Sequence, residues 1–356
     1  MSAIDPSKTR PGGIQSYVLG LAQYLCSVGI DVTLIGAGLP PRDTPFRFIP
    51  ATEDSSPSSF DFSRALRRMV RKDRVPDGIV HAQRLDDIVP FISIDRGIGR
   101  IVTIHGDSVP GVRQRHGPLV AAAYRRLERR GVKAANKVLF VDSSSQAALA
   151  QRYPKDEWKF VGSRIGIDLG AFCPQDRSSS QKDWDVDNQP HVLFAGRFEA
   201  EKNLLGLARA LPHCETRPIV LLAGAGRRKG EAEAALHAWP HRFLGVVPHQ
   251  RMPSLYSAVN ATILPSTREA MPLTCVESLA CGTPVVATRT GDLPQLIRPG
   301  ENGYLSETEP VELAHAIDRA VRKRDRMQAA CRASVASFGW DQVGPSIVRI
   351  YREVLG

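Results

Sequence analysis

The stretch Ser266–Val286, STREAMPLTCVESLACGTPVV, decides the fold, because it predicts a helix followed by a buried strand. Proline suits a first helical turn, where its missing N–H would have no partner, so Pro272 indicates a helix start and Leu273–Ala280 the helix. Two carboxylates, Glu269 and Glu277, flank this start eight positions apart, or roughly 12 Å at about 1.5 Å per helical residue. Unpaired backbone N–H groups at a helix start favour an anion such as a diphosphate. The stretch therefore predicts an anion site with an acid at each end.

A second stretch, His191–Leu211 (HVLFAGRFEAEKNLLGLARAL), adds two cations to this picture. It places Gly196, Arg197 and Lys202 on a loop between an apolar strand and an amphipathic helix. Arginine offers a planar fork of donors and lysine a point charge, and both suit phosphate groups. Two glutamates alone would be weak evidence, since their spacing recurs by chance, and a solvated basic loop is the alternative interpretation. The position directly after a strand favours ligand binding.

Apolar strands and amphipathic helices alternate along the sequence, which predicts an α/β fold of parallel sheets flanked by helices. A chain of 356 residues is too long for one compact core, so we expect two doubly wound, Rossmann-like domains. The polar tract 174–190 is interpreted as a linker between domains at 1–173 and 191–340. The expected strands are Val32–Ile35, Gly78–His81, Arg100–His105, Lys137–Val141, Val192–Ala195, Ile219–Ala223, Arg242–Gly245, Ala261–Leu264 and Pro284–Ala287.

Composition narrows the class of protein. No apolar run is long enough to cross a bilayer, and the first residues, MSAIDPSKTR, lack the apolar core of a signal peptide, so we expect a cytoplasmic protein. The six cysteines are scattered without metal-ligand spacing, which indicates reduced thiols. Asp183, Asp185 and Asp187 alternate in a Ser-rich polar tract rather than at the end of a buried strand, and no glycine follows Asn188 as a calcium loop requires. We therefore expect neither a metal nor another cofactor.

The first half carries two further candidate features. Gly12 and Gly13 follow Pro11 on a predicted loop before the first helix, where missing side chains let backbone N–H groups approach a ligand. The strand expected ahead of this loop is reduced to MSAID. His105 ends a predicted strand, and ligands of open parallel sheets bind outside the carboxyl ends of strands. A plain turn and a structural histidine are the alternative interpretations.

Together these residues resemble the retaining, nucleotide-sugar-dependent glycosyltransferases of family 4, which have the two-domain GT-B fold with a cleft between the domains. The resemblance runs from RPGGIQSYVLGLAQYLCSVGIDVTLIG near the start to FGWDQVGPSIVRIYREVL at the end, and it is strongest over 191–305. It implies transfer of a hexosyl group from a nucleoside diphosphate sugar to an acceptor hydroxyl. It also implies that the last helix, 341–356, crosses back to the first domain.

The resemblance implies a role for each matching residue. Glu269 would bind hydroxyls of the donor sugar, Glu277 the ribose, and Arg197 with Lys202 the diphosphate. His105 would bind the donor sugar. The resemblance implies that the loop LLAGAGRRKG, with Gly224, faces the donor. The glycine spacing of this loop and the absence of a following acid do not fit a dinucleotide loop. The remaining donor-binding positions would be Gly12, Gly13, Gly196, Val247, Pro248, Ala270, Met271, Pro272 and Leu273.

The chain departs from the family pattern at two places. The Asn-Gly pair before the linker is Ile165-Gly166, and the double glycine after the last core strand is Gly291-Asp292. These departures put contacts at the domain hinge in doubt more than the chemistry. A GT-B epimerase or phosphorylase, or an inactive protein that binds sugar nucleotides, remains the alternative function.

The net charge of +10 bears on the acceptor. Most of the excess lies in the first half, the acceptor side in this fold, on two predicted helical faces. Such faces bind anionic lipid headgroups or acidic saccharides, which would place the protein on the inner face of the cell membrane. A solvated arginine-rich surface is the alternative, whereas nucleic acid is not expected without an aromatic or recognition-helix pattern. The two faces comprise Arg64, Arg67, Arg68 and Arg71, and Arg125, Arg126, Arg129, Arg130 and Lys133.

Overall fold

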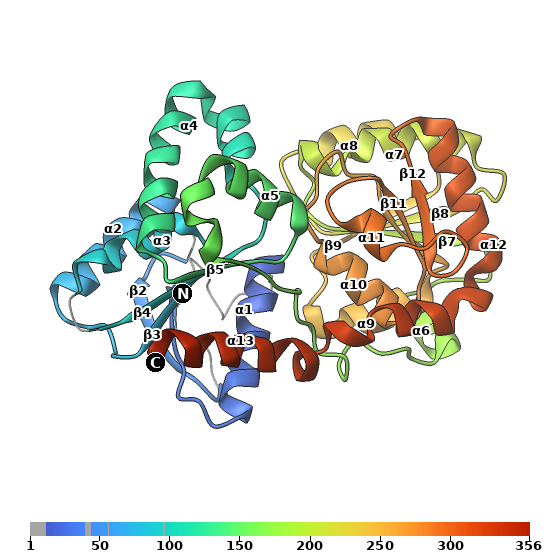
Figure 1. Ribbon diagram of the computed structural model, residues 1–356. Helices are drawn as coiled ribbons and strands as arrows, with labels where there is room; N and C mark the ends of the chain where they lie inside the picture. The colour runs from blue at the N-terminus through green and yellow to red at the C-terminus, as the bar shows by residue number, and fades with distance from the viewer. Residues whose placement is uncertain (1–11, 40–43, 56, 95–96) are drawn as a thin grey trace. The chain divides into compact units, whose positions relative to one another are not determined.

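The computed structural model describes residues 12–39, 44–55, 57–94 and 97–356, and the chain divides into two compact units (Figure 1). The first unit comprises Met1–Gly166 and Trp340–Gly356, and the second Ile167–Gly339. Each is an α/β unit of parallel strands and helices. The short strand expected in MSAID lies outside the described residues.

The second unit contains one six-stranded parallel sheet in the order β12-β11-β10-β7-β8-β9. When the strands are numbered in chain order, this is the doubly wound order 3-2-1-4-5-6. The order in which strands are added to the sheet reverses between β7 and β10. The strands are β7 (His191–Ala195), β8 (Ile219–Ala223), β9 (His241–Gly245), β10 (Ala261–Leu264), β11 (Val285–Thr288) and β12 (Gly303–Ser306). The helices are α6 (Arg177–Asp183), α7 (Leu204–Ala210), α8 (Lys229–Leu236), α9 (Met252–Ala258), α10 (Leu273–Ala280), α11 (Leu293–Leu296) and α12 (Pro310–Ser334).

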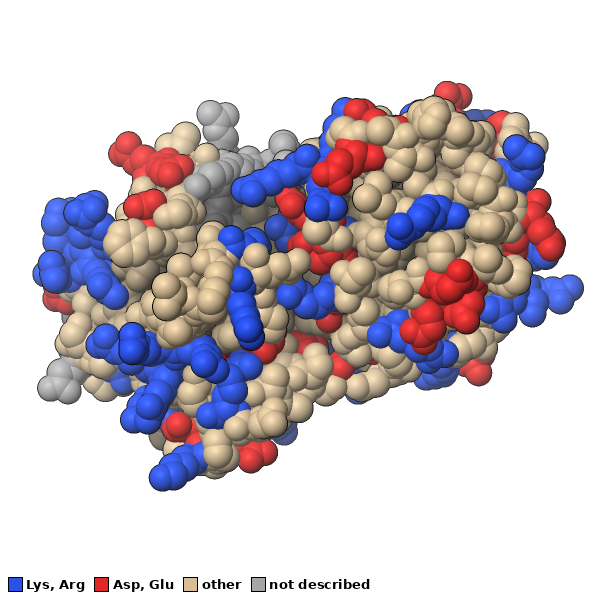
Figure 2. All heavy atoms as spheres, turned by 90° about the horizontal axis from the view of Figure 1, so that it is seen from above, with Lys and Arg blue, Asp and Glu red and all other residues tan. Residues whose placement is uncertain are grey.

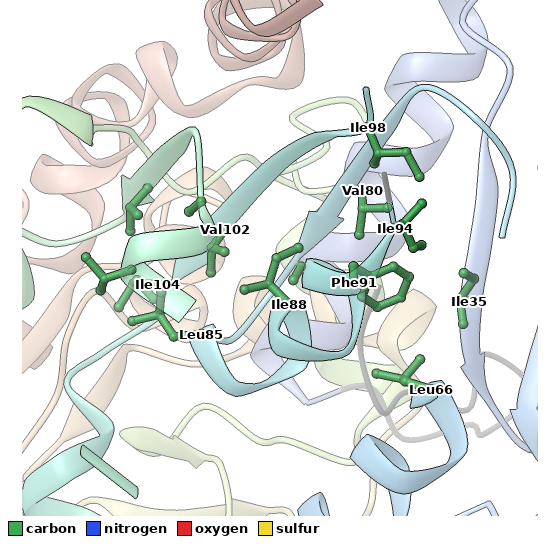
Figure 3. Close-up of a cluster of buried hydrophobic side chains, with 14 of the residues drawn as sticks. Ile35, Leu66, Val80, Leu85, Ile88, Phe91, Ile94, Ile98, Val102 and Ile104 are labelled. Atoms are coloured by element: carbon green, nitrogen blue, oxygen red, sulfur yellow. The ribbon is translucent and has the colours of Figure 1, made fainter. Parts of the chain in front are cut away.

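In the first unit, the described strands form a four-stranded parallel sheet, β3-β4-β5-β6, and a parallel pair, β1-β2. A buried apolar cluster fills the space between these strands and their helices, including Leu66, Ile88, Phe91 and Val102 (Figure 3). The strands are β1 (Thr33–Ala37), β2 (Arg47–Thr52), β3 (Ile79–Ala82), β4 (Gly99–Ile104), β5 (Lys137–Phe140) and β6 (Phe160–Gly162). The helices are α1 (Gly13–Ser27), α2 (Ser59–Arg71), α3 (Leu85–Ile88), α4 (Ser108–Ala134), α5 (Ser143–Arg152) and α13 (Trp340–Leu355). No helix in the described part of the chain is long and apolar enough to cross a membrane.

The final helix, α13, packs within the first unit, although residues 167–339 lie between it and the rest of that unit. The ring of Trp340 lies 5.3 Å from that of Tyr17 and 6.4 Å from that of Tyr24, both on α1. Gly20 and Gly166 make room for this indole, since a Cβ at either would lie within 3 Å of it. Two glycines and an aromatic cluster therefore fix the end of the chain to its beginning.

The domain boundaries differ from those expected. Residues 167–173 belong to the second unit rather than the first, because Arg332 of α12 donates hydrogen bonds to the carbonyls of Leu169 and Phe172. Beside them, the Ile167 N–H donates to the Phe338 carbonyl at 2.9 Å. The chain thus leaves the first unit after residue 166 and returns at residue 340.

The tract 174–190, expected to be a linker, is also part of the second unit and contains α6. The Asp176 side chain caps α6 by accepting a hydrogen bond from the Ser179 N–H at 2.8 Å. Trp184 packs against α9 and the turn before it. Its Nε1 donates to Ser254 Oγ at 2.8 Å, and the Arg251 guanidinium lies 4.2 Å from its ring centre. A helix cap and an aromatic anchor thus help to order a segment whose composition resembles a linker.

Three strands are missing from the sequence-based expectation. β2 contains Pro50 and lies at the edge of its pair, which is where a sheet tolerates proline. β6 has three residues, and β12 (GYLS) alternates too briefly to stand out from the polar residues around it. All three are defined by pairing with a neighbouring strand, β1, β5 and β11 respectively, rather than by a local sequence pattern.

Candidate active site

The candidate site lies at the carboxyl end of the second unit's sheet, where β7 and β10 are neighbours and the strand order reverses. In open parallel sheets, ligands bind at this switch point because the loops leaving its two strands diverge to opposite faces. The loop after β7 carries Gly196, Arg197 and Lys202, and the loop after β10 carries Glu269. The topology therefore brings together two motifs that lie far apart in the sequence.

A buried aromatic side chain anchors the loop after β7. Phe198 is fully buried and contacts the rings of Phe194 and Phe243. Its N–H donates to the Ala225 carbonyl at 3.0 Å, which ties this loop to the one after β8. Gly224 lies at this junction with φ +139°, and a Cβ there would be 1.9 Å from the Gly196 carbonyl oxygen. The backbones of Gly196 and Gly224 are therefore in direct contact, and a side chain at Gly224 would separate the two loops.

Asn203 holds the end of the same loop in a left-handed conformation, with φ 50°. Its Oδ1 accepts from the Gly206 N–H, which caps α7, and its Nδ2 donates to the Pro265 carbonyl at the end of β10. The Thr267 N–H also donates to the Glu201 carbonyl at 2.8 Å. These bonds fix the position of Lys202 relative to the loop that carries Glu269.

An ion pair joins the two loops. Lys202 Nζ lies 2.5 Å from Glu269 Oε1, and the two side chains are 18 % and 9 % exposed. Ser266 Oγ donates to the same carboxylate oxygen at 2.6 Å. Sequence reasoning gave these two residues different parts of a ligand, whereas the structure pairs them directly. Because both are largely buried, the pair holds a charged lysine and an acceptor carboxylate in fixed positions at the switch point.

The loop after β11 supports the backbone beside Glu269. Gly291 has φ +52°, and a Cβ there would lie 2.2 Å from the Ala270 carbonyl oxygen and 2.5 Å from that of Glu269. The Asp292 N–H donates to the Ala270 carbonyl at 3.1 Å. The Gly291-Asp292 pair therefore keeps the glycine at the position where close backbone approach requires it.

The start of α10 lies beside the end of β7, where the side chain of Thr274 reaches the last residue of the strand. The helix has the predicted bounds, Leu273–Ala280, and Pro272 is its N-cap. Thr274 Oγ1 contacts the Ala195 carbonyl at 3.5 Å. Leu273 is buried, while Ala270, Met271 and Pro272 are partly exposed. The first N–H groups of this helix thus lie next to the loop that carries Lys202.

At the other end of α10, two residues that sequence reasoning missed hold Glu277. Its Oε2 accepts from the buried Tyr256 hydroxyl at 2.9 Å, and its Oε1 lies 3.0 Å from His249 Nε2. Burial alone would lower the pKa of His249, but the hydrogen bond and charge of Glu277 raise it above its usual value. The His249 ring also packs on Phe172 at 4.9 Å between ring centres. Neither residue stood out in the sequence, because Tyr256 lies in an apolar helix and His249 simply follows a proline.

The remaining predicted residues of this unit lie around the pair without joining it. Arg197 is 66 % exposed, and its nearest carboxylate is Glu201 at 3.6 Å. Val247 is half-buried and Pro248 exposed, directly before the turn His249–Arg251 that carries the partner of Glu277. Val247 and Pro248 thus directly precede His249, the partner of Glu277, in the chain, and Arg197 is free to reorient.

In the first unit, the predicted residues gather at the start of α1 and the end of β4. Gly12 is the exposed N-cap of α1, and Gly13 begins the helix. One turn later, the Tyr17 ring meets the His105 ring edge-on, with centres 4.8 Å apart. His105 Nε2 donates to Gln83 Oε1 at 2.8 Å, and burial lowers the pKa of His105 to about 3. The imidazole is therefore neutral at physiological pH, and its Nδ1 is the nitrogen that can accept a hydrogen bond.

Helix α3, which follows β3, contains two buried aspartates, Asp86 and Asp87, that sequence reasoning did not single out. Asp86 is bound to Arg84, whereas neither carboxylate oxygen of Asp87 has a hydrogen-bond partner among the described residues. Burial, with the charge of Asp86, raises the pKa of Asp87 to about 7. A buried carboxylate without a donor is unfavourable when ionised.

We expect Asp87→Asn to stabilise the protein at pH 8, by about 1–3 kcal/mol, because it removes this charge. The folded-state pKa lies above the unfolded value of 3.8, so the folded state binds a proton more tightly, and stability from this group falls as pH rises from about 4 to about 7. Urea midpoints at pH 5 and pH 8 measure the effect, which should be larger at pH 8. Asp86→Asn serves as the control and should destabilise, since it removes the carboxylate that pairs with Arg84. Equal effects of the two changes would contradict the assignment.

Comparison with known proteins follows the same division of the chain. Residues 11–170 match the family described as Glycosyltransferase Family 4, and residues 176–334 match Glycosyl transferases group 1. Among curated proteins, D-inositol 3-phosphate glycosyltransferase of Geodermatophilus obscurus is 29 % identical over 63 % of this chain and 54 % of its own length. That of Thermobifida fusca is 31 % identical over 53 % of this chain and 49 % of its own. The chain thus matches about half the length of these two relatives.

Solved structures share the whole fold. Sucrose-phosphate synthase from Thermosynechococcus elongatus superposes with a TM-score of 0.84 at 20 % identity, covering 99 % of this chain and 98 % of its own. Anabaena Alr3699/HepE in complex with UDP-glucose superposes with a TM-score of 0.79 at 18 % identity, covering 99 % of both chains. Both halves match glycosyltransferase families, and both units have the Rossmann-like architecture expected. The chain therefore belongs to the GT-B glycosyltransferases of family 4.

Proposed function

We propose that this chain is a retaining glycosyltransferase, which moves a hexosyl group from a nucleoside diphosphate sugar to an acceptor hydroxyl. The Lys202–Glu269 ion pair at the switch point of the second unit is the observation that carries the proposal. An ammonium and a carboxylate held side by side match the two parts of such a donor, the diphosphate and the sugar hydroxyls. Glu277, held by Tyr256 and His249 at the far end of α10, supplies the acceptor oxygens that a ribose diol needs.

The proposed reaction breaks the bond between the anomeric carbon and the diphosphate oxygen and forms one to the acceptor oxygen on the same face. The acceptor proton passes to the departing phosphate. Negative charge grows on the diphosphate oxygens in the transition state, so fixed donors around them accelerate the step. Lys202 and the first N–H groups of α10 are the fixed donors of the second unit, and Arg197 can join them by reorienting. Gly12, Gly13 and His105 are the proposed donor contacts of the first unit.

The comparisons support a nucleotide-sugar donor without naming the sugar of this chain. Anabaena HepE has been solved with UDP and with UDP-glucose, and several curated relatives are named D-inositol 3-phosphate glycosyltransferases. For this chain the acceptor is proposed to be an anionic lipid or an acidic saccharide at a membrane surface. Arg64, Arg67, Arg68 and Arg71 of α2 are exposed, while Leu66 and Met69 on the opposite side of that helix are buried. We propose no metal and no nucleic acid as a partner.

A thermal-shift panel of uridine, guanosine and adenosine diphosphate sugars tests the donor proposal. At a concentration 100 times its Kd, a ligand specific for the folded state adds about 2.7 kcal/mol, which raises Tm by about 5 °C or more. One base should stand out, and Glu277→Gln should remove its shift while leaving the unliganded Tm close to that of wild type. Failure of every nucleotide sugar to raise Tm would contradict the proposal. Formation of an epimer without acceptor, or a bound pyridoxal chromophore, would instead identify an epimerase or a phosphorylase.

A further inference from the structure

Helix α4 is interrupted at Gly117, where an added Cβ would meet nothing within 4 Å. Gly117 has φ 83° and ψ 175°, which interrupts the helix, and Pro118 begins its second part. A non-glycine residue rarely adopts this conformation, so the bend is encoded in the sequence. Figure 1 shows α4 projecting beyond the neighbouring elements of the first unit. The bend therefore forms an apex, defined here as residues 113–126.

The tip of this apex is apolar. Leu119 is 85 % exposed, the largest value among the exposed large apolar side chains of the described residues, and Val120 is 48 % exposed. Pro118, Ala122 and Ala123 are exposed beside them. A single exposed leucine is ordinary on a protein surface, but a contiguous apolar tip on a projecting bend indicates a binding surface.

The flanks of the apex are strongly basic. Arg113 and Arg115 precede the bend and Arg125 and Arg126 follow it, and all four are exposed. There is no acidic residue between Ser108 and Leu127, and no carboxylate of the described chain forms an ion pair with any of these four guanidinium groups. The next acid, Glu128, is buried and bound to Arg152. Figure 2, which views the molecule from above α4, shows Lys and Arg side chains gathered over the first unit.

We propose that the α4 apex inserts into the surface of a membrane containing anionic phospholipids. Leu119 and Val120 would enter the boundary between headgroups and acyl chains, while the four arginines bind the headgroup phosphates. A second copy of the chain fits the apex less well, because a symmetric contact would place one arginine cluster against another. Nucleic acid would engage the arginines but leave the apolar tip in water. An anionic bilayer complements both the charge of the flanks and the apolar tip.

This inference deepens the proposed function and rests on it, because membrane binding by the apex would bring the enzyme to a lipid acceptor. The membrane contact itself is separate from donor binding, because no apex residue belongs to the candidate site. Vesicle binding and nucleotide-induced thermal shifts therefore test the two proposals independently.

Co-sedimentation of the full chain with vesicles tests the contact. We expect binding to phosphatidylcholine vesicles containing about 30 % phosphatidylglycerol at about 0.1 M salt, and loss of that binding with pure phosphatidylcholine or at about 1 M salt. Leu119→Ser with Val120→Ser should weaken binding at least tenfold. Leu355→Ser is the matched control, since Leu355 is an apolar residue of the same unit and is 60 % exposed. Its binding should equal that of wild type.

Two further variants separate insertion from charge alone. Leu119→Trp should shift its fluorescence to shorter wavelength on addition of anionic vesicles, relative to wild type, because an inserted indole leaves water. Arg113→Gln with Arg115→Gln should weaken binding more than Arg67→Gln with Arg68→Gln on α2. The proposal is wrong if the tip variants bind vesicles as wild type does, if no wavelength shift occurs, or if the α2 pair carries the binding.

Discussion

Lys202→Ala is expected to lower the rate of sugar transfer a few hundred-fold, or about 3–4 kcal/mol of transition-state stabilisation. The ammonium is 2.5 Å from Glu269. Its loop is held to the loop after β10 by the Asn203 Nδ2 bond to the Pro265 carbonyl and by the Thr267 N–H bond to the Glu201 carbonyl. A lysine held in this way needs no reorganisation when charge develops on the leaving diphosphate, and alanine offers no donor in its place. Initial rates at saturating donor, with each nucleotide sugar that raises Tm, measure the effect on kcat.

The partner variant and a surface control complete this test. Glu269→Gln keeps the size of the side chain but removes the charge, so transfer should fall while the fold persists, because Ser266 Oγ can still donate to the amide oxygen. Lys229 forms a comparable ion pair with Glu233, at 3.0 Å, but both side chains are about half exposed. Lys229→Ala should leave the rate unchanged. Wild-type rates for Lys202→Ala would show that the pair is structural only.

How far the sequence predicts this site depends on how local each part is. Gly196, Lys202 and the start of α10 were predictable because a strand end and a helix start are encoded within a few residues. The pairing of Lys202 with Glu269 was not, since 67 positions separate them and their contact follows from β7 lying beside β10. That strand order is a property of the whole sheet, which no window of sequence contains.

The partners of Glu277 were hidden for a related reason. Tyr256 is fully buried on α9 and is indistinguishable in sequence from a core residue of an apolar helix. Its role appears only when α9 and α10 are packed together and its hydroxyl meets a carboxylate 21 positions away. The misjudged linker shows the opposite case, because α6 is a local element whose polar composition masked its cap at Asp176 and its aromatic anchor at Trp184.

Gly224→Ala is expected to have the largest effect on stability. Gly224 has φ +139°, where an alanine costs about 1–3 kcal/mol, and its Cβ would lie 1.9 Å from the Gly196 carbonyl oxygen. The obstructing atom belongs to the backbone, so the clash can be relieved only by moving one of the two loops, at a further cost of about 1–3 kcal/mol. We expect Tm to fall by about 10 °C, as measured by differential scanning calorimetry.

Gly230→Ala is the matched control, because the glycine lies six residues further along in α8 and a Cβ there would meet nothing within 4 Å. Alanine is favoured over glycine in a helix, so this variant should match or slightly exceed wild-type stability. The two variants also separate the loop from the helix in donor binding. The loop that Gly224→Ala displaces is the one that carries Lys202, so its thermal shift with nucleotide sugar should shrink, whereas Gly230→Ala should keep the full shift. Equal Tm values for the two variants would mean that the Gly196–Gly224 contact does not hold the loop in place.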